Sequence, residues 1–222
     1  MTNLKKRILT SLIIFPLSIF FILKGGYFLL FFLLTIFFVA NYELFSVFNK
    51  KSTILLLDLI LIISLYSIYY LADHAVSFYL LLWIIILVIC SDIGGYLFGK
   101  IFKWKKLTKI SPKKTLSGVF GSFIFSLLSL FIANTILPSA SDIFIPISSL
   151  INFLEPKFFF LAIILSLVAQ AGDLTISYFK RIEKIKDTGK ILPGHGGILD
   201  RIDSLMFVVI VTFILIRINI IP

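Results

Sequence analysis

Long apolar stretches separated by short polar connections run through the whole chain. Seven of them stand out, at residues 8–23, 27–48, 54–71, 77–97, 119–137, 158–177 and 205–221. Each is close to the roughly 20 residues that an α-helix needs to cross about 30 Å of hydrocarbon. The pattern predicts an all-α fold, a polytopic membrane helix bundle with about seven transmembrane helices.

The composition excludes a water-soluble globule. Of the 222 residues, 59% are hydrophobic and 14% are charged, whereas about a quarter of the residues of a soluble domain are charged. A single cysteine, Cys90, excludes an intrachain disulfide and a cysteine-based zinc cage. We expect one integral-membrane domain over residues 1–222, with N-terminal helices in 1–75 and the helices and longer polar loops that hold the candidate site in 76–222.

The basic residues lie almost entirely on one side of the predicted bundle. If the connections alternate sides from the N-terminus onward, all of the 21 Lys and Arg residues except Lys24, Lys157 and Arg217 fall on the N-terminal side. The positive-inside rule then places the N-terminus and both long basic connections in the cytoplasm. The net charge of +10 is therefore interpreted as a partnership with the lipid bilayer and not with nucleic acid. On the outer side, 138–157 is expected to form a loop.

The connection after the fourth stretch carries a first set of candidate site residues. A carboxylate in the last turns of a membrane helix is costly, so Asp92 is a functional candidate. Lys113 and Lys114 directly precede a predicted helix start, where free N–H groups and the helix dipole favour anions. The alternatives are a hydrated interfacial aspartate and a topology-setting lysine cluster attracted to anionic lipid.

The connection after the sixth stretch holds three aspartates that suit a divalent cation. Asp200 and Asp203 are three residues apart at a predicted helix start, so they share one face. Asp173 ends the preceding membrane helix at the same depth, and we expect the three to converge. Mg²⁺ takes one or two carboxylates together with substrate phosphates and waters. The sequence therefore predicts Asp173, Asp200 and Asp203 as metal ligands.

Bases and glycines surround these aspartates. Arginine offers a two-pronged donor and lysine a point charge to phosphate oxygens, and glycines allow a ligand to approach the backbone closely. The alternatives are helix caps, lipid anchors and a tight turn. The candidates for phosphate binding are Lys180, Arg181, Lys186 and Arg201, and the glycines are Gly194, Gly196 and Gly197.

Both connections resemble one family, the phosphatidate cytidylyltransferases or CDP-diacylglycerol synthases. The resemblance is carried by residues 177–203, with Lys180-Arg181, Lys186-Asp187, Leu192-Pro193, His195-Gly196-Gly197 and Asp200-Arg201-Ile202-Asp203. A second segment is similar at Ser91-Asp92, Gly95-Tyr96, Gly99-Lys100 and Ser111-Pro112-Lys113-Lys114-Thr115. The chain departs from the family at Ser117 and Ile176, where relatives usually have glutamates.

The resemblance implies transfer of CMP from CTP to phosphatidate, giving CDP-diacylglycerol and pyrophosphate, with Mg²⁺ as cofactor. It also implies a multi-pass protein of the cell (inner) membrane, with its site on the cytoplasmic side, and a homodimer. The catalytic residues would be Asp173, Lys186, Asp187, His195, Asp200 and Asp203, with His195 as a phosphate contact or orienting group. The substrate-binding residues would be Asp92, Lys113, Lys114, Ser177, Lys180, Arg181, Gly196, Gly197 and Arg201.

Other functions remain open at this point. One is a CTP-dependent enzyme acting on another lipid, such as a polyprenol kinase or an ether-lipid cytidylyltransferase. Another is an ion or proton transporter using Asp58, Asp92 and Asp173 as intramembrane carboxylates. A membrane scaffold would leave the clustering of acids and bases unexplained.

Overall fold

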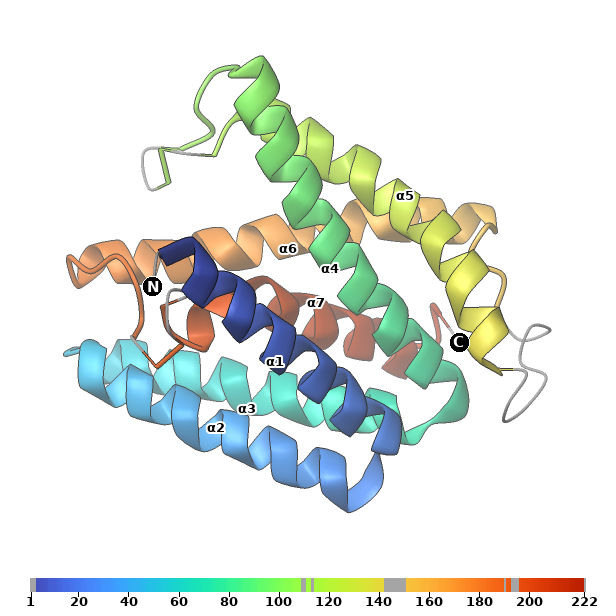
Figure 1. Cartoon of the computed structure of the whole chain (residues 1–222), viewed down its shortest axis with the longest axis horizontal. Helices are drawn as coiled ribbons and strands as arrows, with labels where there is room; N and C mark the ends of the chain where they lie inside the picture. The colour runs from blue at the N-terminus through green and yellow to red at the C-terminus, as the bar shows by residue number, and fades with distance from the viewer. Residues whose placement is uncertain are drawn as a thin grey trace.

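The computed structural model describes residues 3–108, 111–112, 114–141, 151–189, 191–192 and 196–221, with side chains left out for 3–9, 11, 75 and 138–141. Within these ranges the chain forms seven α-helices, and its only β-type pairings are isolated bridges (Figure 1). The all-α prediction is confirmed. The helices are α1 (Asn3–Lys24), α2 (Gly26–Val47), α3 (Lys51–Asp73), α4 (Ala75–Phe102), α5 (Leu116–Ser141), α6 (Pro156–Ile182) and α7 (Leu199–Arg217).

The helices extend beyond the apolar stretches that predicted them. Polar residues continue the helix wherever the neighbouring turns support it, so α6 includes Lys180 and Arg181 and α7 begins at Leu199, well before residue 205. The prediction of a loop from residue 138 is wrong at its start, because α5 runs on to Ser141. The middle of that predicted loop, 142–150, lies outside the described residues.

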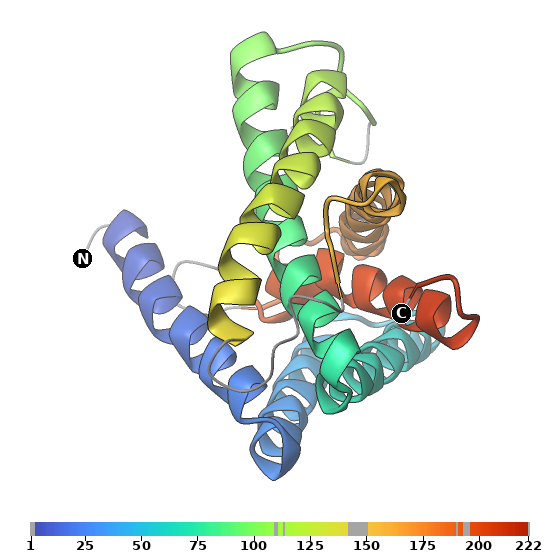
Figure 2. The same cartoon turned by 90° about the vertical axis from the view of Figure 1, so that its right-hand side faces the viewer.

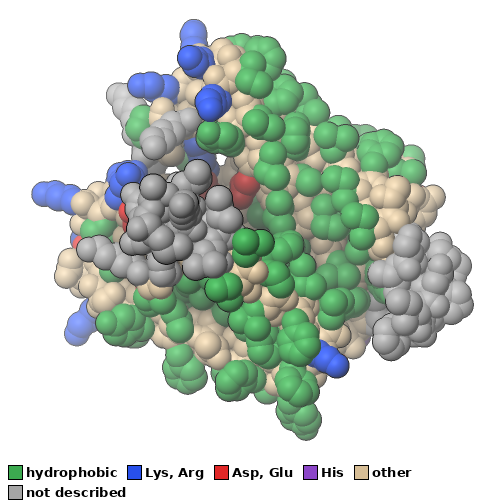
Figure 3. All heavy atoms as spheres, viewed as in Figure 1, with side chains coloured by type: hydrophobic (Ala, Val, Ile, Leu, Met, Phe, Trp, Pro, Cys, Tyr) green, Lys and Arg blue, Asp and Glu red, His purple; other side chains and the backbone are tan. Residues whose placement is uncertain are grey.

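The exposed surface is that of a multi-pass membrane protein. Five helices of the described chain, α2 to α6, are long and apolar enough to cross a bilayer. On α2 the rings of Phe31, Phe38 and Phe45 are each about two-thirds exposed, and their spacing of seven residues places them along one face. A continuous apolar face of this kind is unfavourable in water and suits lipid. Figure 3 shows hydrophobic side chains over most of the visible face, with Lys and Arg mainly at its left and upper edges.

The bundle combines a hairpin of two helices with a layer of helices that the hairpin crosses at an angle (Figures 1 and 2). α4 and α5 run antiparallel and cross over the layer that contains α2, α3, α6 and α7 (Figures 1 and 2). They meet backbone to backbone, since a Cβ on Gly118 would lie 2.9 Å from the carbonyl oxygen of Gly95. The end of this hairpin projects from the rest of the bundle (Figure 2).

Aromatic packing fixes the end of the bundle where α6 begins. Trp83 of α4 is fully buried, and its ring contacts those of Phe153 and Phe158. The indole Nε1 donates a hydrogen bond to Ser129 Oγ of α5, at 3.2 Å. This packing joins α4, α5 and α6. The connections after α2, α4 and α6 lie toward the opposite end of the bundle, as does the start of α1 (Figure 1).

Candidate functional site

A pocket of about 420 Å³ opens among α4, α5, α6 and α7 at the end that carries the polar connections. Its described lining combines carboxylates and cations with small and hydroxyl-bearing residues such as Gly95, Thr115 and Ser122. Such a lining suits a highly charged ligand and not an apolar one. The lining acids are Asp92, Asp173, Asp187, Asp200 and Asp203, and the lining bases are Lys114, Lys180 and Arg201.

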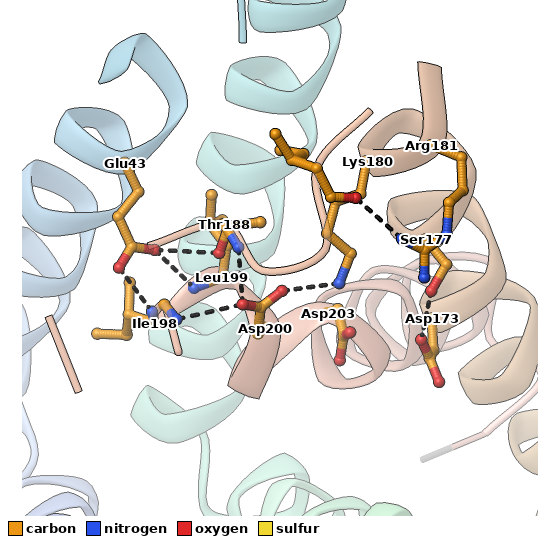
Figure 4. A network of polar contacts seen from close by, with 12 residues as sticks. Glu43, Asp173, Ser177, Lys180, Arg181, Thr188, Ile198, Leu199, Asp200 and Asp203 are labelled. Atoms are coloured by element: carbon orange, nitrogen blue, oxygen red, sulfur yellow. Dashed lines mark hydrogen bonds and ion pairs between the residues drawn. The ribbon is translucent and has the colours of Figure 1, made fainter. Parts of the chain in front are cut away.

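Asp200 lies in the first turn of α7 and is held by three donors. Its Oδ1 atom forms an ion pair with Lys180 Nζ at 2.7 Å, and the two side chains are only 7% and 10% exposed. Its Oδ2 atom accepts hydrogen bonds from the backbone N–H groups of Thr188, at 2.8 Å, and Gly197, at 3.2 Å (Figure 4). Charge-assisted bonds of this kind are short and strong, and they offset the cost of burying a charge.

Asp173 lies nine residues before the last residue of α6, so the prediction that it ends this helix is wrong. In the described part of the chain its carboxylate is held by side chains alone. Lys114 Nζ lies 2.7 Å from Asp173 Oδ2, and Ser177 Oγ donates to Asp173 Oδ1 at 3.2 Å. Lys114 also donates to the Gln170 carbonyl at 3.4 Å. Lys114, two residues before α5, thereby reaches across the pocket to α6.

Asp92 and Asp203 also line the acidic side of the pocket, together with Asp187 of the α6–α7 connection. Asp92 comes from α4, and Asp203 from α7, one turn after Asp200. The backbone N–H of Ser204 donates to Asp203 Oδ1 at 2.8 Å. The predicted convergence of Asp173, Asp200 and Asp203 is confirmed to the extent that all three line one pocket.

The structure does not bring every candidate into the pocket. Arg181 is exposed and donates to the Ile185 carbonyl at 3.0 Å, and Lys186 is exposed as well; neither belongs to the described lining. Gly196 and Gly197 lie beside Asp200 and not on the pocket wall, and Gly196 has a φ of +88° that favours glycine. Lys113, His195 and Gly194 lie outside the described residues.

The two departures from the family pattern fit their surroundings. Ile176 is 2% exposed and packs in the hydrophobic core. The Ser117 hydroxyl lies 3.0 Å from Thr115 Oγ1 at the start of α5. A glutamate at position 176 would place a charge among apolar side chains.

Sequence reasoning missed one carboxylate, Glu43 in α2. It is 1% exposed and accepts hydrogen bonds from the N–H groups of Ile198 and Leu199, at 2.9 and 3.2 Å. It also accepts one from Thr188 Oγ1 at 3.4 Å (Figure 4). The available signal was a lone carboxylate inside an apolar stretch, which is expensive unless it has partners.

The fold and the pocket together define a class: a multi-pass helical membrane protein with a charged pocket at one end of its bundle. The sequence matches the Cytidylyltransferase family over residues 48–219. The chain belongs to that family.

Relatives from several bacteria match more than half of the sequence. The chain is 41% identical to the phosphatidate cytidylyltransferase of Staphylococcus epidermidis over 129 residues, 58% of this chain and 45% of that protein. With the phosphatidate cytidylyltransferase of Helicobacter pylori the identity is 38% over 127 residues, 57% of this chain and 43% of that protein. With that of Staphylococcus haemolyticus it is 40% over 141 residues, covering 63% and 50%. The chain thus spans about half the length of the curated relatives it matches.

Proposed function

We propose that this chain transfers CMP from CTP to phosphatidate, forming CDP-diacylglycerol and pyrophosphate. The observation that carries the proposal is the meeting of five aspartates and three cations, from three helices and two connections, in one pocket at the polar end of the bundle. The family and the activity for which the relatives are named support it.

The reaction brings two polyanions together. A phosphate oxygen of the lipid attacks the α-phosphorus of CTP, the bond from that phosphorus to the bridging oxygen breaks, and pyrophosphate leaves. The lipid phosphate is already ionised, so no general base is required. The task of the protein is to position the reactants and to neutralise charge, and Lys114, Lys180 and Arg201 stand in the pocket for that purpose.

The donor set fits a divalent cation. The described pocket lining carries more carboxylates than cations, and hard ions such as Mg²⁺ take carboxylate and phosphate oxygens. Within the described residues no three acidic, histidine or cysteine side chains are close enough to hold an ion by themselves. Two of the lining carboxylates are paired, Asp173 with Lys114 and Asp200 with Lys180. Mg²⁺ needs only one or two protein carboxylates when substrate supplies the rest.

We assign the Mg²⁺ site to the group of Asp173, Asp200 and Asp203, of which one or two would hold the ion beside substrate phosphate oxygens; the bound ion would neutralise charge on the triphosphate. In this assignment Lys180 and Lys114 exchange part of their carboxylate contacts for phosphate oxygens as substrate binds. Arg181 and Lys186, which lie outside the described lining, would meet only the outer part of the nucleotide.

The membrane arrangement extends the same proposal. With α1 and α7 added to the five helices that qualify by length and composition, the chain would cross the inner membrane seven times. The distribution of Lys and Arg supports a cytoplasmic N-terminus and a cytoplasmic site. The homodimer implied by the family resemblance stays a prediction, which chemical crosslinking in native membranes tests.

The experiment is pyrophosphate release from CTP by the purified protein in detergent micelles, with and without phosphatidate. We expect release only with phosphatidate and Mg²⁺, together with radiolabelled CDP-diacylglycerol from α-labelled CTP. Release of CDP in place of pyrophosphate would identify a lipid kinase and overturn the proposal. Ion flux in proteoliposomes without any CTP turnover would identify a transporter instead.

A further inference from the structure

We propose that Glu43 of α2 is a positioning residue for the site: it holds the α6–α7 connection in the shape that orients Asp200. Glu43 belongs to the N-terminal helices, and the described pocket lining does not include it. Its activity test rests on the proposed cytidylyltransferase function, whereas its structural test does not.

The first observation is that Glu43 supplies an acceptor for the start of α7. The first N–H groups of a helix have no partner within the helix. The residue before α7 is Ile198, which has no side-chain oxygen to cap the helix. Glu43 accepts from the N–H groups of both Ile198 and Leu199, so α2 provides the cap that the sequence of α7 lacks.

The second observation is that Thr188 joins Glu43 to Asp200. The Thr188 hydroxyl donates to Glu43 Oε2 at 3.4 Å, and the Thr188 backbone N–H donates to Asp200 Oδ2 at 2.8 Å. Thr188 is fully buried between the two carboxylates. A shift of the Glu43 carboxylate therefore moves a donor of Asp200, and with it the face that Asp200 presents to Lys180.

The third observation is the absence of side chains where the connection meets Glu43. A Cβ on Gly189 would lie 2.5 Å from Glu43 Oε1, and a Cβ on Gly197 would lie 2.5 Å from Glu43 Oε2. The backbone thus lies directly against the carboxylate on two sides. Gly197 also donates its N–H to Asp200 at 3.2 Å, so the same residue contacts both acids.

Together these contacts explain why a charge is buried in an apolar helix. An unpaired carboxylate there would be costly, and this one has three donors, two from the α6–α7 connection and one from Leu199, the first residue of α7. The Glu43 carboxylate, held in α2, fixes the position of the connection. A site misplaced by about 1 Å can lose about 100-fold in rate, so Glu43 affects the reaction rate by positioning Asp200.

The test compares Glu43→Gln with Asp58→Asn in the full-length protein in detergent. Asp58 is a matched control because it is also a carboxylate within a membrane helix, α3, with an Oδ1 atom that is buried and has no described hydrogen-bond partner. Hydrogen exchange measured by mass spectrometry on peptides covering 186–199 gives a readout that is independent of CTP turnover.

In Glu43→Gln one carboxylate oxygen becomes an amide NH₂ that cannot accept. We expect exchange in 186–199 to accelerate at least about 10-fold and kcat to fall about 10- to 100-fold, while the KM for CTP changes less than about 3-fold. Asp58→Asn should leave exchange in 186–199 and kcat close to those of the unmodified protein.

Unchanged exchange in 186–199 would overturn the proposal whether or not the protein turns over CTP. Accelerated exchange with normal kcat would also overturn it, by reducing Glu43 to a structural contact. An equal response in Asp58→Asn would show a general effect of removing an intramembrane charge, with the same consequence. If the unmodified protein does not transfer CMP, the proposed function is wrong. The exchange result would still show whether Glu43 holds the α6–α7 connection in place.

Two further variants test whether Glu43 acts through Asp200. Adding Glu43→Gln to Asp200→Asn should lower the residual kcat by less than about 3-fold, because residues that act as a unit are not additive; independent, multiplying losses would overturn the proposal. If Glu43→Gln does not fold, Thr188→Val removes only the hydroxyl that donates to Glu43 and should lower kcat about 3- to 10-fold. Full activity and normal exchange in that variant would overturn it equally.

Discussion

The two connections that supply the pocket are built in opposite ways. The α6–α7 connection and the first residue of α7 are tied to Glu43 and Asp200 by backbone N–H groups. The ion pair between Lys180 and Asp200, on the two flanking helices, is 10% and 7% exposed. The α4–α5 connection stands at the end of a projecting hairpin (Figure 2). Its ion pair between Lys114 and Asp173 is 24% and 32% exposed.

The difference separates a fixed half of the site from an adjustable one. Backbone donors cannot turn away from a carboxylate without moving the chain, whereas a lysine side chain rotates at little cost. Ion pairs that are partly exposed are also weaker than well-bonded buried ones. We therefore expect the α6–α7 side to set the geometry of the reaction and the α4–α5 side to adapt to the substrate that arrives.

The largest effect is expected at the fixed half. Asp200→Asn should lower kcat for CMP transfer about 10²- to 10³-fold, the loss typical when one electrostatic partner of a transition state is removed. Thin-layer analysis of labelled CDP-diacylglycerol measures it, with Glu183→Gln as a control, because Glu183 bonds to Asn49 at the same end of α6. Activity of Asp200→Asn near that of the control would remove Asp200 from the site.

Two glycine-to-alanine substitutions, one beside each half of the site, test how rigid each half is. Gly189→Ala should destabilise the protein by about 1–3 kcal/mol, as expected of overpacking, because its Cβ would meet the Glu43 carboxylate at 2.5 Å. Gly99→Ala, where the nearest atom is Thr115 Oγ1 at 3.1 Å, should cost clearly less. Thermal unfolding midpoints in detergent measure both, and equal midpoints would contradict the contrast.

A smaller effect is expected from the adjustable half. Lys114→Ala should raise the KM for CTP or phosphatidate about 10-fold, the value of one hydrogen bond to a charged group, while kcat changes less. Steady-state kinetics in mixed micelles separate the two parameters. Lys157→Ala is the control, since Lys157 pairs with Glu155 at the opposite end of α6. A fall in kcat alone would place Lys114 in the fixed half.

The smallest effect concerns the exposed lysines at the hairpin end, Lys103, Lys105 and Lys106. Replacing all three with alanine should raise the apparent KM for phosphatidate about 2- to 5-fold in anionic vesicles at low salt, because each lysine near a charged surface contributes about 1 kcal/mol at most. The effect should fade at high salt as the charges are screened. A salt-independent change would indicate a direct contact with substrate.

The sequence predicted the fold well because helix length in a membrane is dictated by the bilayer. Each of the seven apolar stretches lies wholly or largely within one helix. The boundaries were less accurate where polar residues continue a helix. α7 begins at Leu199 because Glu43 caps it from α2, a long-range contact that no local pattern reveals.

The candidate site was predictable where the chemistry was local. Asp200 and Asp203 were expected on one face at a helix start, and both line the pocket. Arg181 and Lys186 carry the same positive charge as Lys180, yet of these three only Lys180 lines the described pocket. The packing of the helices, and not the charge of the side chain, decides which base is buried. Glu43 was missed because its partners are more than a hundred residues away along the chain.

The bonds of Glu43 also bear on where this protein can be divided. The stretch that matches the family begins at residue 48, whereas the acceptor for the first N–H groups of α7 sits upstream, in α2. A truncation at that sequence boundary would leave Ile198 and Leu199 without their shared acceptor. The smallest stretch expected to fold on its own therefore includes α2 and is longer than the stretch that matches the family.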